Sequence, residues 1–135
     1  MTVDAQPEER LQRYLADLVM TATPVQRLLM LFEHLGRDLS TAAVAFDAAD
    51  WKAVNDSLVH AQHILFALRD PLDRESELGR SLAAVYDFCL DRLLACNLQK
   101  DPSLLPAVQE LVGQVATANA MAAASAASEA AVVNA

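Results

Sequence analysis

Glycine, cysteine, aromatic residues and positive charge are all scarce in this chain of 135 residues. Only three glycines and few β-branched residues occur, which favours helix over sheet. The ten Lys and Arg residues form no cluster and are outnumbered by acidic residues, for a net charge of −8, which argues against nucleic acid as a partner. No apolar run is long and hydrophobic enough to cross a bilayer and no secretory signal is legible, so we expect a cytoplasmic protein without membrane insertion.

The only two cysteines are Cys89 and Cys96. On a helix they share one face and lie two turns apart, roughly 10 Å along the axis, which is too far for a disulfide between them. Their apolar neighbours disfavour the thiolate that a nucleophile requires. We therefore predict two reduced thiols in the core of the protein.

The three histidines do not follow a metal-binding pattern. His60 and His63 lie one helical turn apart, and His34 lies on the preceding helix, so a metal site inside a bundle can be drawn. The Glu-x-x-His pairs that such sites use are missing. Glycine-rich phosphate loops and Gly-x-Ser-x-Gly are missing as well. We predict no metal, no cofactor and no enzymatic activity.

Start and stop signals divide the chain into four long helices. Thr23 through Gln26 supplies a Thr N-cap, a proline at the first helical position and a Gln at the third. Asp50 caps a second helix, which Asp70-Pro71 ends, because the residue before a proline avoids the helical region. Asp101-Pro102 opens the last helix, whose regular part is expected to start near Pro106. The expected ranges are 24–46, 51–69, 78–100 and 102 into the alanine-rich tail.

These helices predict an all-α fold. A chain of this length buries roughly two thirds of the surface that its unfolded form exposes, so one domain with a real core is expected. Short connectors place successive helices side by side and antiparallel, as in an up-down four-helix bundle. We assign 1–22 to a helical or extended N-terminal segment, 23–121 to the bundle, and 122–135 to a frayed, disordered, alanine-rich tail.

The helix expected from Leu78 to Lys100 is apolar over more than half of its circumference. The first apolar row, expected to be core, contains Leu78, Leu82, Val85, Cys89, Leu93 and Cys96. The second row, on an adjoining face, contains Tyr86, Leu90, Leu94 and Leu98. Either this helix lies at the centre of a well-packed bundle, or the second row is a surface for a partner helix.

Short motifs along the chain resemble the flagellar secretion chaperone family FliS. The matching pieces lie between Tyr14 and Val115 and keep the order of the family. They are Tyr14 followed by Thr21-Ala22-Thr23-Pro24; Leu29-Met30-Leu31-Phe32; Ala61-Gln62 followed by Ile64-Leu65 and Leu68; Tyr86-Asp87-Phe88; and Arg92-Leu93, Asn97-Leu98 and Lys100-Asp101. One departure is Asp91, which stands where the family commonly has a basic residue.

The resemblance implies a cytoplasmic chaperone that binds the disordered C-terminal segment of flagellin, prevents premature polymerisation and delivers flagellin to the flagellar type III export apparatus. It also implies that the segment around Tyr14 is a movable cap, with the export gate or an anti-sigma factor as further partners of a monomer or weak homodimer. The groove residues assigned on this basis are Tyr14, Gln62, Tyr86, Leu90, Arg92, Leu94, Asn97 and Leu98. The alternative from a different class is a non-catalytic bundle that acts in dimerisation or as an adaptor.

Overall fold

The computed structural model describes residues 7, 9–13 and 23–133. The helices of the bundle are α2 (Pro24–Asp47), α3 (Trp51–Arg69), α4 (Glu77–Gln99) and α5 (Leu105–Val133), with a short 3₁₀ helix η1 (Pro102–Leu104) before α5. Residues 7 and 9–13 are also helical, and the described residues include no strand. The all-α prediction is confirmed.

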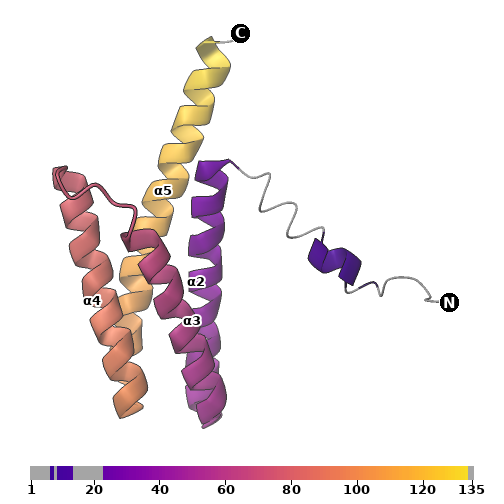
Figure 1. Cartoon of the computed structure of the whole chain (residues 1–135), viewed down its shortest axis with the longest axis vertical. Helices are drawn as coiled ribbons and strands as arrows, with labels where there is room; N and C mark the ends of the chain where they lie inside the picture. The colour runs from indigo at the N-terminus through magenta and orange to yellow at the C-terminus, as the bar shows by residue number, and fades with distance from the viewer. Residues whose placement is uncertain (1–6, 8, 14–22, 134–135) are drawn as a thin grey trace.

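Successive long helices run in opposite directions, as Figure 1 shows. Helix α3 packs against α2 and α4, and α5 packs against both α2 and α4, which closes a ring of four helices. This is the up-down order predicted from the short connectors. Helix α5 continues past the ends of its neighbours.

The helix starts follow from local hydrogen bonds. The backbone N–H of Gln26 donates to Thr23 Oγ1 at 3.1 Å, and the backbone N–H of Thr23 donates to Gln26 Oε1 at 2.9 Å. The predicted capping box is therefore present. The Asp50 carboxylate accepts from the Ala53 amide at 3.2 Å. Helix α5 begins at Leu105 after η1, which places Pro106 in its first turn, where its missing N–H costs no helical hydrogen bond.

The connector between α3 and α4 is held close to the start of α4. The Ser76 hydroxyl accepts from the Gly79 amide at 2.9 Å and donates to the Asp73 carbonyl at 3.1 Å. A Cβ at Gly79 would lie 1.8 Å from that same carbonyl oxygen, so the close approach requires glycine here. The Arg80 guanidinium donates to the carbonyls of Arg74 and Glu75 at 3.1 and 2.9 Å.

The core contains one face of each helix. Its fully buried large side chains are Leu35, Leu39, Leu58, Leu65, Leu93, Leu105, Val54, Val108, Cys89 and Cys96. Of these, Cys89, Leu93 and Cys96 lie on the row of α4 that was predicted to be core. Leu28 and Leu31 of α2 are only partly buried against this cluster.

The predicted division of α4 into a core row and a surface row is correct for Cys89, Leu93 and Cys96, which are fully buried, and for Leu94 and Leu98, which are exposed. It is wrong for the other members of both rows. Leu78 is 70% exposed, and Leu82 and Val85 are only partly buried. Tyr86 and Leu90, both assigned to the surface row, are buried instead. Figure 1 shows that α4 and α5 diverge from η1 toward the start of α4, which agrees with the greater exposure of the early part of the first row.

The alanine-rich tail is helical in the structure. It was expected to be disordered from residue 122, whereas α5 continues to Val133. Alanine has the highest helix propensity of all residues, so this segment extends the helix without needing tertiary contacts. The described side chains from 124 to 130 are exposed.

Candidate functional site

A cavity of about 410 Å³ lies between α3 and α4. Its lining residues are Gln62, Phe66 and Arg69 from α3, and Asp87, Leu90, Asp91 and Leu94 from α4. The three residues from α3 follow one another at steps of four and three, and so do Asp87, Asp91 and Leu94 of α4, so each wall is one face of a helix. We call this cavity, together with Leu98 beyond it on α4, the α3–α4 groove.

The middle of the α3–α4 groove exposes large apolar side chains. Phe66 is 45% exposed on one wall and Leu94 is 49% exposed on the other. Leu98, one turn further along α4, is 75% exposed. Leu90, which belongs to the α4 wall, is buried. Facing apolar side chains on two parallel walls suit an amphipathic helix or an extended apolar segment.

One end of the groove is closed by an ion pair. Arg69 Nε donates to Asp87 Oδ1, and Arg69 Nη1 lies 3.7 Å from Asp70 Oδ1. Asp91, one turn further along α4, also lines the cavity, and no described cation forms an ion pair with its carboxylate. The residues that line the cavity therefore carry two carboxylates, Asp87 and Asp91, and one guanidinium, that of Arg69.

The other end of the groove is joined by amide hydrogen bonds. Asn97 Nδ2 donates to Asn55 Oδ1 at 2.9 Å, which links α4 to α3. Lys100 Nζ donates to Asn97 Oδ1 at 2.6 Å, so both polar atoms of this buried amide are satisfied. Polar contacts at both ends thus hold the two walls in a defined register.

The structure brings together part of the predicted site. Gln62, Leu90 and Leu94 line one cavity, and Asn97 and Leu98 continue from it along α4.

The other predicted residues lie elsewhere. Tyr86 is 3% exposed and belongs to the core. The Arg92 guanidinium lies over the ring of Phe88, 4.9 Å from its centroid, outside the residues that line the cavity. Tyr14 falls outside the described residues.

Sequence reasoning missed Phe66 and Arg69. The available signal was the series Gln62, Phe66 and Arg69, which continues one helix face beyond the core stripe and ends in a charge. That series becomes a site only when α4 places Asp87 opposite Arg69, and this pairing of distant residues is not a local property of either helix.

The histidines and cysteines form no reactive centre in the described part of the chain. His60 Nδ1 lies 2.5 Å from Asp38 Oδ2, which joins α3 to α2, and no group of three or more metal-ligating side chains occurs among the described residues. Both cysteines are buried and free, as predicted. Burial raises the pKa of the Cys89 thiol to about 11, so it remains protonated at neutral pH.

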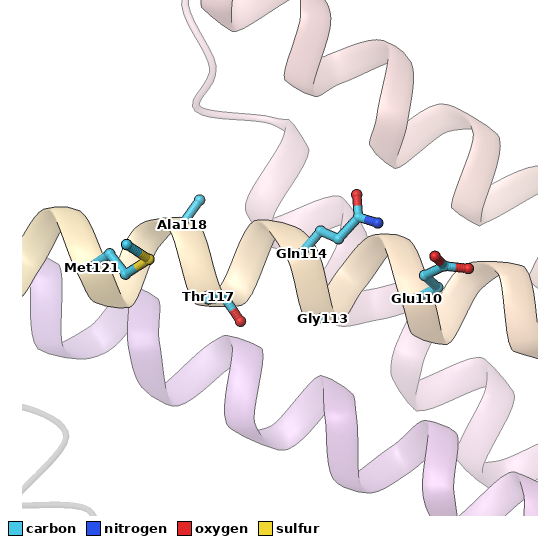
Figure 2. Close-up of a pocket in the computed structure, with 6 residues that line it drawn as sticks. All are labelled: Glu110, Gly113, Gln114, Thr117, Ala118 and Met121. Atoms are coloured by element: carbon cyan, nitrogen blue, oxygen red, sulfur yellow. The ribbon is translucent and has the colours of Figure 1, made fainter.

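A larger cavity of about 650 Å³ lies along α5 but offers only one wall. Figure 2 shows its six lining residues on α5 alone, with Thr117 pointing toward α2 while Gln114 and Ala118 point the other way. The smaller α3–α4 groove has two facing walls, exposed leucine and phenylalanine, and fixed charges. We therefore take it as the candidate functional site.

Fold and groove together define a helical bundle with a partly apolar groove on its surface. Among the described residues, no helix has the length and hydropathy needed to span a bilayer. The chain matches the family model "Flagellar protein FliS" over residues 7–126.

Three curated relatives carry the name flagellar secretion chaperone FliS. The Bacillus subtilis protein is 34% identical over 99 residues, covering 73% of this chain and 74% of the relative. The Salmonella typhimurium and Escherichia coli proteins are 32% and 34% identical over 103 residues, covering 74% of this chain and 76% of each relative. The chain therefore belongs to the FliS family, as its motifs indicated.

Proposed function

We propose that this protein is a flagellar secretion chaperone that binds the C-terminal segment of flagellin in the cytoplasm, prevents its premature polymerisation and supports its export by the flagellar type III secretion system. The names of the relatives support the chaperone role. The structural observation that carries the proposal is the α3–α4 groove, with Phe66 and Leu94 half-exposed on facing walls.

The groove meets the physical requirement of such a chaperone. A filament subunit has apolar terminal segments that pair with neighbouring subunits, so these segments must be covered before assembly. A disordered segment can fold as it binds, and the apolar area that it buries offsets the entropy lost on ordering. Phe66, Leu94 and Leu98 supply exposed apolar surface, while the polar ends of the groove limit how the segment can sit.

The remaining predictions extend this proposal. Gln62 contributes its side-chain amide to the α3 wall of the groove. Asn97 holds the α4 wall in place through its hydrogen bond to Asn55 of α3. The segment around Tyr14 acts as a movable cap that the client displaces. The export gate or an anti-sigma factor is the further partner that we propose for a monomer or weak homodimer.

The test is Leu94→Asp, measured by calorimetry with a peptide from the C-terminal region of the same organism's flagellin. A charge between the apolar walls should weaken binding by roughly tenfold or more, since an unpaired carboxylate would be desolvated by the client. Leu78→Asp is the matched control, because Leu78 is an exposed leucine on the same helix outside the groove. Far-ultraviolet circular dichroism should show both variants helical. Equal binding by both variants would exclude the groove as the client site.

Light scattering with and without flagellin separates the chaperone from a dimerisation or adaptor bundle. The chaperone should form a discrete heterocomplex with one copy of each protein. A structural dimer should keep its mass when flagellin is added.

A further inference from the structure

The residues that line the α3–α4 groove include two carboxylates, Asp87 and Asp91, and one positive charge, that of Arg69. The guanidinium of Arg69 already pairs with Asp87 and Asp70, so it is not available to an incoming anion. Asp91 is exposed, lines the cavity and has no described ion-pair partner. An acidic client residue would therefore meet Asp91 and the neighbouring carboxylates, whereas a basic client residue would complement them.

We propose, on the basis of the proposed function, that Asp91 determines client specificity. It selects a helical client segment that carries a Lys or Arg one turn away from the apolar side chain that enters between Phe66 and Leu94. Asp91 is a binding residue of the groove in this role, and the Arg69–Asp87 pair fixes the wall beside it.

The spacing of the client residues follows from the spacing on α4. Asp91 and Leu94 are separated by one helical step of three, which places them as neighbours on one face. A client helix lying along this face places its apolar side chain against Leu94 and its cation near Asp91 when the two client residues are three or four positions apart. The half-exposed ring of Phe66, in the same cavity, offers an aromatic surface for the aliphatic stem or the charge of that side chain.

The test must separate the effect of Asp91 on client affinity from the effect of the net charge of −8, because that charge attracts any cationic segment. Asp91→Lys and Glu110→Lys change the net charge equally, and both original residues are exposed. Glu110 lies on α5 (Figure 2) and is not among the residues that line the α3–α4 groove. Binding of the flagellin C-terminal peptide is measured by calorimetry at low and physiological ionic strength, together with peptides in which each Lys or Arg is changed to Glu.

We expect Asp91→Lys to bind the wild-type peptide roughly two- to fivefold more weakly at low salt, with a smaller difference at higher salt. Glu110→Lys should bind as the unaltered protein does. One Lys→Glu or Arg→Glu peptide should lose affinity for the unaltered protein and regain it with Asp91→Lys. That reciprocal rescue would locate the client cation beside Asp91.

The inference is overturned if Asp91→Lys binds as tightly as the unaltered protein, if Glu110→Lys weakens binding equally, or if no reversed peptide is rescued. In each of these cases, loss of binding by Leu94→Asp would still support the α3–α4 groove as the client site. Retained binding by Leu94→Asp would instead reject the site on which the proposed function rests.

Discussion

Helix α4 makes two contacts of different kinds, one with α3 and one with α5. The α3–α4 contact is joined by the Arg69–Asp87 ion pair at one end and by the Asn55–Asn97 hydrogen bond at the other. Among the described side chains, no hydrogen bond or ion pair joins α4 to α5. Apolar packing alone holds the α4–α5 contact, and there the large side chains near η1 are fully buried.

The comparison shows how one helix serves both stability and binding. Near η1, where only apolar groups meet, α4 and α5 pack closely and form part of the core, and the two helices diverge toward the start of α4. Where polar contacts fix the two ends, apolar side chains between them can remain exposed in a constant arrangement. The α3–α4 groove is therefore defined by its polar ends as much as by its leucines.

The largest expected effect comes from the apolar contact. Leu93 is fully buried, and Leu93→Ala should lower the free energy of unfolding by about 2–5 kcal/mol, because it removes buried apolar area and leaves a cavity. Urea denaturation measures the loss. Leu78→Ala, at an exposed position on the same helix, should change stability little. Similar losses in the two variants would contradict the view that the early and late parts of α4 differ in packing.

A smaller effect is expected at the connector that leads into the groove. Gly79→Ala places a Cβ against the Asp73 carbonyl, so the connector must shift, at a cost of about 1–3 kcal/mol.

Gly36→Ala is the matched change in α2, where nothing lies within 4 Å of the new Cβ. Alanine should stabilise that helix by up to about 1 kcal/mol. Thermal denaturation of both variants provides the measurement, and opposite signs are expected. If Gly79→Ala were as stable as the unaltered protein or more stable, the connector would not need glycine.

The smallest effect is expected at the polar end of the groove. Asn97→Ala removes the link between α4 and α3 and should cost about 1 kcal/mol, because Asn55 and Lys100 are exposed enough to bond to water. Client affinity should fall by more than this stability loss explains, since the walls lose their register. Calorimetry at a temperature where the variant is fully folded tests this, and unchanged affinity would show that the amide link does not shape the groove.

Local chemistry made most of the fold predictable. Three signals that mark helix ends each act within one helical turn: the Thr23 capping box, the Asp50 cap and the Asp70-Pro71 stop. A few residues of sequence are therefore enough to predict these helix ends. The core stripe of α3 is likewise one face of one helix. The predicted start of α4 at Leu78 is one residue late, because Ser76 is the N-cap and the helix begins at Glu77.

The faces of α4 were not predictable by the same reasoning. Whether Leu82 and Tyr86 are buried depends on how closely the neighbouring helices approach α4, which is a property of the whole bundle. The candidate site shows the same limit. Gln62, Leu90 and Leu94 could be found from patterns along the chain, while the pairing of Arg69 with Asp87 requires two helices in register.

The extension of α5 beyond the bundle has a consequence for the motions of the chain. A helix that makes no tertiary contacts is stabilised by its own propensity alone, and short isolated helices are marginal in water. Backbone amides in the exposed alanine-rich part should therefore exchange with solvent through local opening, while those near Leu105 and Val108 should exchange only when the bundle unfolds. The two parts of this one continuous helix should therefore differ in hydrogen exchange: the first part exchanges only with unfolding of the bundle, and the alanine-rich part opens and closes while the bundle stays folded.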